Sequence, residues 1–224
     1  MIKGYSYYQS NIDKRVIDVH QRIMRLFDDV EMTYIIGDKT TSHYEAMDKS
    51  MERESGENDV FWLDIDCIPL RLDAFEYMKR LSDEHPLVGN IQCSNHIENG
   101  RHLFVAPSFM YINENFVEAI KRVNVSAKPN EWGDVAESYT YLADEALDMV
   151  ILFHCSHYAK KPLECEKWET RPYYKSFGRF ATFEDLSGNP ISFHAFQMRT
   201  GSEVEEYLDI AEMTYQKLLN EKQQ

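Results

Sequence analysis

The sequence predicts an α/β protein in which helices flank a mainly parallel, mixed β-sheet. Short apolar runs alternate along the chain with amphipathic segments of helical spacing, which is typical of βαβ units. The chain has 224 residues, 43% of them hydrophobic, so it can bury the core of one α/β domain. No repeat, low-complexity tract or Pro/Gly/Ser-rich linker divides it, and residues 1–224 are expected to form a single domain.

The first half of the chain contains three predicted strand–helix pairs. Apolar runs predict strands at 2–8, 32–36 and 60–64. The helix after the first strand is expected to be capped by Asn11. The second helix is expected to open with a capping box of Ser42 and Glu45, and the third to cover about 73–83.

The second half continues the alternation with longer connections. Strands are predicted at 86–92, 103–112, 149–153 and 191–196. Helices are predicted at 113–123, at about 131–147, and from a capping box at Ser202 to the end of the chain. The aromatic stretch 158–180 has no regular pattern.

The most informative stretch is 60–70, where the run Val-Phe-Trp-Leu is followed by Asp64, Ile65 and Asp66. Alternate residues of a strand point the same way, so both carboxylates are expected on one face of the sheet. Pro69 marks the exit from the sheet, and ligands of open α/β sheets bind at this carboxyl edge. Paired carboxylates without an obvious basic neighbour favour a hard divalent cation.

This strand, its D-x-D and the exit at Pro69 resemble the metal-binding signature of GT-A-fold glycosyltransferases. The resemblance covers about 1–200 in element order, and implies a Rossmann-like domain with a nucleotide-binding part at about 1–100. An acceptor-side part at about 101–200 and a C-terminal helix at about 202–222 would follow. The resemblance further implies Mn²⁺ or Mg²⁺ on Asp64 and Asp66, gripping the diphosphate of a nucleotide-sugar donor, with a UDP-sugar as the expected donor.

His194 resembles the late histidine that supplies a third metal ligand in some of these enzymes. Its neighbours Phe193 and Ala195 are apolar, so alternation along the strand would turn the imidazole away from them. One imidazole beside two carboxylates is tolerated best by Mn²⁺. The competing interpretation is a structural histidine with satisfied hydrogen bonds in an apolar strand.

Two residues are candidates for holding the nucleoside. Asp38 follows Gly37 at the end of the second predicted strand, where the resemblance places contacts with the base or ribose. Tyr5 lies on the first strand, from which an aromatic ring could stack on the base. The alternatives are an ordinary turn for Asp38 and a core position for Tyr5.

The segment from Trp132 to Glu137 resembles the acceptor-side region where inverting glycosyltransferases keep their catalytic carboxylate. An acceptor hydroxyl has a pKa far above neutrality, so a positioned carboxylate must take its proton. Asp134 and Glu137 are both candidates for this base. Their spacing also satisfies a helix capping pattern, so one could cap the helix while the other acts.

The balance of charge narrows the possible partners. A net charge of −14 argues against a large basic surface for nucleic acid, and makes a metal bridge to an anionic nucleotide more plausible. No segment has the roughly 18 apolar residues of a membrane span, and the N-terminus has no signal-peptide pattern. A soluble, cytoplasmic protein is expected.

The predicted activity is therefore sugar transfer from a nucleoside-diphosphate donor to a hydroxyl acceptor. The acceptor could be a glycan, a protein, a small molecule or, less in keeping with the charge, a hydroxylated nucleic-acid base. The nearest alternative is a nucleotidyltransferase acting on a sugar phosphate, which usually needs a glycine- and lysine-rich N-terminal loop that 2–14 lacks. A non-catalytic nucleotide- or sugar-binding protein of the same fold is the third interpretation.

Overall fold

The fold comes from a computed structural model and is described for residues 1–38, 41–54, 57–93, 103–129, 134–144, 150–158, 180–195 and 202–224. The strands are β1 (Ile2–Gln9), β2 (Val30–Gly37), β3 (Val60–Leu63), β4 (Cys67–Pro69), β5 (Leu87–Cys93), β6 (Leu103–Ile112), β7 (Val150–Tyr158), β8 (Phe180–Glu184) and β9 (Pro190–Ala195). The helices are α1 (Lys14–Met24), α2 (His43–Arg53), α3 (Ala74–Ser82), α4 (Glu114–Val123), α5 (Glu137–Asp144) and α7 (Ser202–Lys222).

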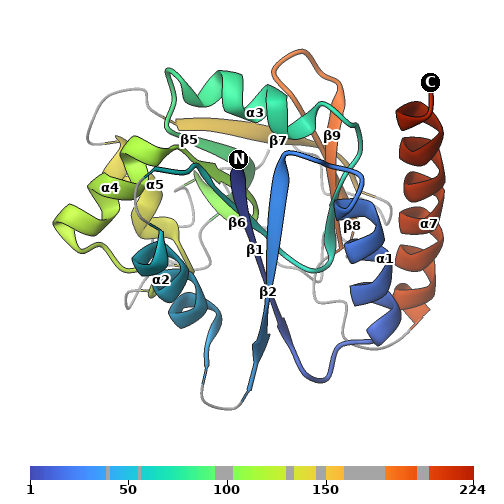
Figure 1. Ribbon diagram of the computed structural model, residues 1–224, viewed down its shortest axis with the longest axis horizontal. Coiled ribbons are helices and arrows are strands. Elements are labelled where there is room, and N and C mark those ends of the chain that lie inside the picture. Colours follow the sequence, from blue (N-terminus) through green and yellow to red (C-terminus); the bar gives the residue numbers. More distant parts are fainter. Residues whose placement is uncertain are drawn as a thin grey trace.

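Across these described ranges the strands form one sheet in the order β2-β1-β3-β6-β5-β7-β8-β9-β4 (Figure 1). In its first six strands only β6 runs against the others, and β8, β9 and β4 then extend the sheet with antiparallel pairs. The predicted α/β class with a mainly parallel, mixed sheet is confirmed. Consequently the carboxyl ends of β1, β2, β3, β5 and β7 meet at one edge.

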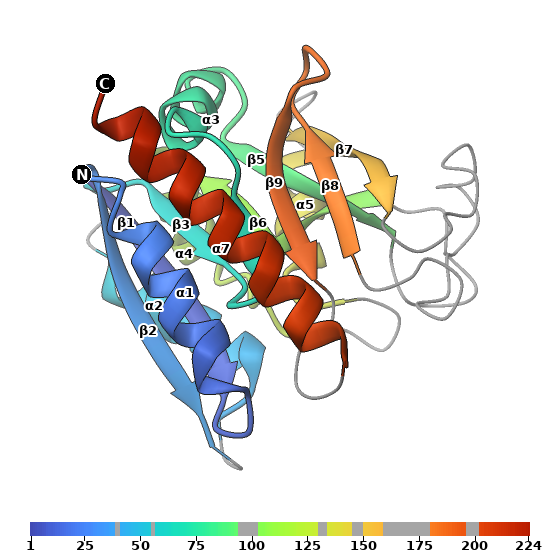
Figure 2. The same ribbon diagram turned by 90° about the vertical axis from the view of Figure 1, so that its right-hand side faces the viewer.

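Helices cover both faces of the sheet. Figure 1 shows α2, α4 and α5 on one side and α1 and α7 on the other, and Figure 2 shows α1 and α7 lying side by side. Strand β3 is buried on both faces: Phe61 and Leu63 pack in the core under α1, α3 and α7, whereas Val60 and Trp62 pack in the core under α2, α4 and α5. This explains the continuous apolar run in the sequence.

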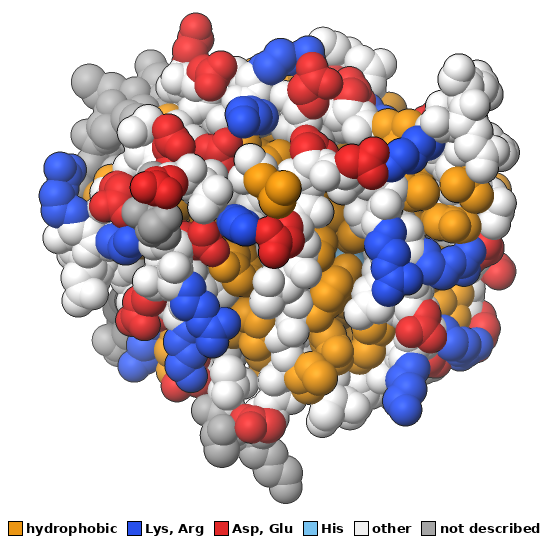
Figure 3. All heavy atoms as spheres, in the orientation of Figure 1, with side chains coloured by type: hydrophobic (Ala, Val, Ile, Leu, Met, Phe, Trp, Pro, Cys, Tyr) orange, Lys and Arg blue, Asp and Glu red, His pale blue; other side chains and the backbone are white. Residues whose placement is uncertain are grey.

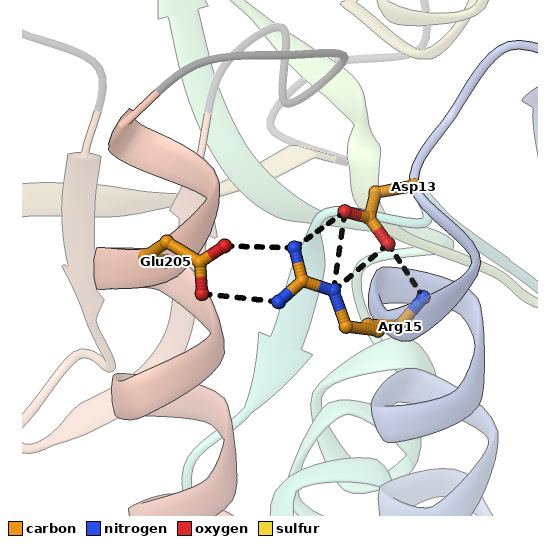
Figure 4. A network of polar contacts seen from close by, with 3 residues as sticks. All are labelled: Asp13, Arg15 and Glu205. Carbon is orange, nitrogen blue, oxygen red and sulfur yellow. Dashed lines mark hydrogen bonds and ion pairs between the residues drawn. The ribbon is translucent and has the colours of Figure 1, made fainter.

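Ion pairs join α1 to α7. Arg15 contacts both Asp13, at the start of α1, and Glu205 on α7 (Figure 4). About two turns further along, Arg22 contacts Glu212 at 2.8 Å. These side chains are largely exposed to water, so the pairs contribute little to stability, and the apolar contacts beneath them hold the helices together.

Several element boundaries differ from the sequence predictions. Asp13, not Asn11, caps α1 by accepting a hydrogen bond from the backbone N–H of Arg15. Helix α5 begins at Glu137 rather than near 131, because Ala136 has a φ of 64°, in the left-handed region that an α-helix excludes. The capping box of Ser42 and Glu45 is confirmed.

The short strands β4 and β8 were not predicted. Three residues are too few to display a period-2 pattern, and Pro69 argues against a central strand. Pro69 is accommodated because β4 is the last strand of the sheet and pairs only with β9 among the described strands. The aromatic stretch 159–179 lies outside the described residues.

A buried ion pair ties the turn between β8 and β9 to the region before α3. Burial alone would raise the pKa of Asp185, but backbone N–H groups of Ser187 and Asn189 and the guanidinium of Arg71 together hold that pKa below its usual value. The carboxylate is thus stabilised in the folded state. Its contribution is present above the unfolded-state pKa of about 3.9 and disappears as pH falls through the lower folded-state pKa.

Asp185→Asn should therefore lower the free energy of unfolding at pH 7 by about 1–3 kcal/mol, and the deficit should shrink as pH falls below about 3.9 and the folded-state carboxylate becomes protonated. Denaturant unfolding across this pH range measures both effects. Asp73→Asn is the matched control, because Asp73 also pairs with Arg71 but its side chain is 54% exposed. It should cost less than about 0.5 kcal/mol, and a deficit for Asp185→Asn that is independent of pH would contradict the charge argument.

Candidate active site at the carboxyl edge of the sheet

The two aspartates of the D-x-D lie in a tight turn that follows β3. Strand β3 ends at Leu63, and the backbone N–H of Cys67 donates to the carbonyl of Asp64 at 3.0 Å. The two carboxylates do lie together, but the predicted cause, alternation along a strand, is wrong because neither aspartate lies in β3. The turn, not the pleat, brings Asp64 and Asp66 together.

His194 completes a cluster with both aspartates. Its Nε2 atom lies 3.4 Å from Oδ1 of Asp66 and 3.8 Å from Oδ2 of Asp64. The pairing of β4 with β9 explains this, since it sets Cys67 opposite His194 and joins the backbone N–H of Ala195 to the carbonyl of Asp66. His194 is 5% exposed, so its imidazole is held in the interior rather than on the surface.

The geometry of this cluster fits one divalent ion. Mg²⁺ lies about 2.1 Å from its ligands, so two ligand atoms on one such ion are at most about 4.2 Å apart. Both distances from His194 meet this limit. The ligand atoms of Asp64, Asp66 and His194 all lie within 4.8 Å of one another, so side-chain movements of less than about 1 Å would bring all three onto one ion. Two carboxylates and one imidazole suit Mn²⁺ or Mg²⁺.

The electrostatics of Asp64 also fit a cation. Burial raises the pKa of Asp64, the imidazoles of His43 and His194 lower it in part, and the Asp66 carboxylate raises it again. The charged form of Asp64 is thus disfavoured in the protein alone. A divalent ion would remove this penalty by replacing water and offsetting the repulsion between the carboxylates.

His43 is a site residue that the sequence analysis missed. It is the first residue of α2, and its Nε2 atom lies 3.6 Å from Oδ1 of Asp64 and accepts a hydrogen bond from the indole N–H of Trp62 at 3.0 Å. Burial lowers the pKa of His43, which favours the neutral imidazole with its proton on Nδ1. The available signal was its position at a helix start just after a parallel strand, at the ligand edge.

The ring of His43 belongs to a row of aromatic side chains beside Asp64. Tyr7 stacks on His43 with centroids 5.2 Å apart, and Tyr5 stacks on Trp62 at 5.9 Å. Tyr5 is only 5% exposed and its hydroxyl donates to Glu54. The structure therefore places Tyr5 in the core, as the alternative interpretation held, and brings Tyr7 closer to the candidate site.

Asp38 lies in the turn after β2, at the same edge as Asp64. Its Oδ1 atom accepts a hydrogen bond from the backbone N–H of Thr41 at 2.9 Å, and the residue is exposed. The side chain thus stabilises its own turn, and its exposure leaves it accessible to a ligand at this edge.

Asp134 and Glu137 occupy different environments. Oε2 of Glu137 accepts from the backbone N–H of Asp134 at 2.8 Å, Oε1 accepts from Tyr141, and Glu137 is 1% exposed. Glu137 therefore makes half of a capping box at the start of α5. Asp134 is half-buried, and its Oδ2 accepts from the amide of Gln92 on β5 at 3.4 Å.

Asn90 joins the strands that carry the metal-site candidates. It is fully buried on β5, and its Oδ1 atom accepts from Ser192 of β9 at 2.8 Å. Its amide nitrogen lies 3.5 Å from the hydroxyl of Ser108, whose backbone carbonyl accepts from the N–H of Asp64. Asn90 therefore fixes β9 and the D-x-D turn relative to each other.

Asn90→Ala should lower the free energy of unfolding by about 1–3 kcal/mol and weaken Mn²⁺ binding by about tenfold, because Ser192 loses its acceptor and the ligands lose their alignment. Isothermal calorimetry and denaturant unfolding separate the two effects. Asn113→Ala is the matched control: Asn113 caps α4, so its loss should cost about 1 kcal/mol without changing Mn²⁺ affinity. Equal metal affinity in both variants would contradict the alignment role of Asn90.

Comparisons with known proteins give no family assignment. No family model matches the chain, and no curated protein matches it. Among solved structures, A197 from STIV has a TM-score of 0.46 at 13% identity, covering 85% of this chain and 93% of that one. The glycosyltransferase GlyE of Streptococcus pneumoniae TIGR4 has a TM-score of 0.47 at 12% identity, covering 98% of this chain and 62% of that one.

A third solved structure is a putative glucose-1-phosphate thymidylyltransferase from Bacillus anthracis, in complex with a sucrose. It has a TM-score of 0.45 at 10% identity, covering 68% of this chain and 86% of that one. Similarities at this level carry no weight for function. None of the described helices is long and apolar enough to cross a bilayer.

Proposed function

We propose that the protein is a metal-dependent glycosyltransferase that moves a sugar from a nucleoside-diphosphate donor to a hydroxyl acceptor. The proposed donor is a UDP-sugar. The carrying observation is the cluster of Asp64, Asp66 and His194 at the carboxyl edge of a mainly parallel sheet. Ligands of open α/β sheets bind at that edge, and the cluster offers the hard ligands that Mn²⁺ and Mg²⁺ prefer.

Each candidate residue has a role that its surroundings support. Asp64, Asp66 and His194 would hold the ion, which would supply charge stabilisation for the departing nucleoside diphosphate. Asp38, exposed at the end of β2, would contact the nucleoside. Asp134 would accept the proton of the acceptor hydroxyl, and the amide of Gln92 at 3.4 Å would orient its carboxylate.

The surroundings of Asp134 favour it over Glu137 as the base. Both carboxylate oxygens of Glu137 accept hydrogen bonds from protein groups, and its side chain is buried. Asp134 keeps part of its surface exposed, and Gln92 places it two residues along β5 from Asn90, which contacts the D-x-D region.

Calorimetric titration of UDP with Mn²⁺, with Mg²⁺ and with EDTA tests the metal and the donor together. UDP should bind at least about tenfold more tightly with the ion, because without it the paired carboxylates repel the diphosphate. Mn²⁺ alone should also raise the melting temperature by mass action. Equal affinity for UDP in EDTA would contradict the proposed metal bridge.

The reaction type is tested by its products. A glycosyltransferase releases UDP from a UDP-sugar when a hydroxyl acceptor is present, whereas a nucleotidyltransferase releases pyrophosphate from UTP and a sugar 1-phosphate. A panel of glycan, peptide and small-molecule acceptors then addresses the acceptor class. Binding of UDP and Mn²⁺ without turnover on any acceptor would favour a non-catalytic nucleotide-binding protein.

A further inference from the structure

The edge strand β2 is open to pairing along its outer side. It is the terminal strand of the described sheet and pairs only with β1. Ile2 of β1 lies opposite Val30 of β2, but its backbone N–H donates to the carbonyl of the preceding residue, Asp29. In a parallel pair this means that the odd-numbered residues of β2 direct their backbone N–H and C=O groups toward β1. Met32 and Tyr34 therefore direct their N–H and C=O groups away from the sheet.

A groove lies beside this open edge, between β2 and α1. It has a volume of about 450 Å³ and is lined by Gln21, Met24, Arg25, Phe27, Val30, Met32 and Tyr34. Figure 3 shows hydrophobic side chains gathered between these two elements, with basic side chains on the α1 side. The volume is within the range of about 300–1,000 Å³ that is usual for ligand pockets.

The side chains of β2 that face the groove carry no charge. Val30, Met32 and Tyr34 lie on the side of the sheet that α1 covers. Ile36 points to the same side of the strand, and its side chain is 59% exposed. Natural edge strands are usually protected by a charge, a proline or a covering segment. This eight-residue strand has no proline, and the side chain of its one charged residue, Glu31, points to the opposite face of the sheet.

Arg25 gives the groove its chemical preference. It is the only charged lining residue, it is exposed, and no carboxylate in the described part of the chain forms an ion pair with it. In a protein with a net charge of −14, an arginine without an acidic partner beside an apolar groove favours an acidic ligand.

We propose that this groove binds an extended peptide segment of a partner protein, which adds a strand to β2 and places an acidic side chain against Arg25. Backbone groups of Met32 and Tyr34 would pair with the peptide, and its apolar side chains, alternate along the strand, would enter the groove. A second copy of this chain fits less well, because the groove-facing residues of its β2 would all be apolar and would leave Arg25 without a partner.

Short end-blocked peptides of alternating valine and threonine, with a central glutamate, glutamine or lysine, provide the probes. The glutamate peptide should bind at least about tenfold more tightly than the glutamine peptide. Arg25→Gln should equalise the two, and Arg25→Glu should transfer the preference to the lysine peptide. Because none of the groove residues is a metal-site candidate, these variants should leave Mn²⁺ binding unchanged. Arg25 is exposed at the end of α1, so they should lower the melting temperature only slightly, and Arg25→Glu more than Arg25→Gln.

Hydrogen exchange of single amides tests the strand pairing. The glutamate peptide should slow exchange at Met32 and Tyr34, whereas Thr33, already bonded to β1, should not change. The proposal is overturned by equal affinity for the glutamate and glutamine peptides, by no binding up to about 1 mM, or by unchanged exchange at Met32 and Tyr34. It is also overturned if these amides become protected with protein concentration alone, which would mean that a second copy fills the groove.

Discussion

Asp66→Asn should abolish sugar transfer and weaken Mn²⁺ binding by about 100-fold or more, while the protein stays folded. Replacing a residue that only supports a metal ligand typically costs 10–100-fold in affinity, so loss of a direct carboxylate ligand should cost at least as much. The fold should tolerate the change, because Asp66 is held through its backbone carbonyl, which accepts from Ala195, and an amide removes repulsion with Asp64. Calorimetry with Mn²⁺ and a thermal melt measure both quantities.

Asp29→Asn is the matched control for this prediction. Asp29 is an exposed carboxylate just before β2, at the opposite end of that strand from the candidate site. The substitution changes the net charge by the same amount, so it should leave Mn²⁺ affinity and turnover unaltered. If Asp66→Asn kept native Mn²⁺ affinity, the ion would have to be placed elsewhere, whatever its effect on turnover.

Most strands and helices with a clear hydrophobic periodicity were predicted correctly from the sequence. The predictions failed where contacts between distant parts of the chain, rather than the local pattern, determine the structure. The run from Val60 to Leu63 is buried on both faces of the sheet, so its apolar character was sufficient to identify it. Asp64 and Asp66 were identified as neighbours for the wrong reason. Their proximity depends on the turn to Cys67 and on β4, whose three residues give no periodic signal.

The contacts around the aspartates are long-range and could not be read from spacing. His194 meets Asp66 because β9 pairs with β4, although more than a hundred residues separate them in the chain. His43 reaches Asp64 from the first turn of α2, and Asn90 joins β5 to β9 through Ser192. The resemblance to GT-A enzymes singled out His194. His43 was marked only by its position at the start of a helix that follows a parallel strand, and nothing in the local sequence distinguished Asn90 from an ordinary strand residue.

The roles of Asp134 and Glu137 show a second limit of sequence reasoning. Their spacing fits a helix cap and a catalytic carboxylate equally well, so the pattern alone left both interpretations open. The structure separates their surroundings: Glu137 is buried and accepts two hydrogen bonds, while Asp134 is half-buried beside Gln92. Asp134 is therefore the residue on which the proposed proton transfer is tested.

Asp134→Asn should lower turnover by about 10²–10⁴-fold and leave donor affinity within about threefold of the native value. Proton removal matters only during transfer, whereas donor binding depends on the metal cluster. Asparagine caps a helix about as well as aspartate, and its carbonyl can still accept from Gln92, so the melting temperature should hardly change. Donor calorimetry and steady-state kinetics on the same preparation measure the two parameters.

Glu137→Gln is the comparison that makes this result decisive. The amide oxygen can still accept from the Asp134 N–H, but the amide nitrogen must donate to the Tyr141 hydroxyl, so both bonds lose the charge of the carboxylate and the variant should lose about 1 kcal/mol of stability. It should nevertheless retain most of its turnover at temperatures well below its melting point. The opposite pattern, with an active Asp134→Asn and an inactive but folded Glu137→Gln, would reassign the base to Glu137. Full activity in both variants would point to a retaining mechanism, in which the departing phosphate accepts the proton.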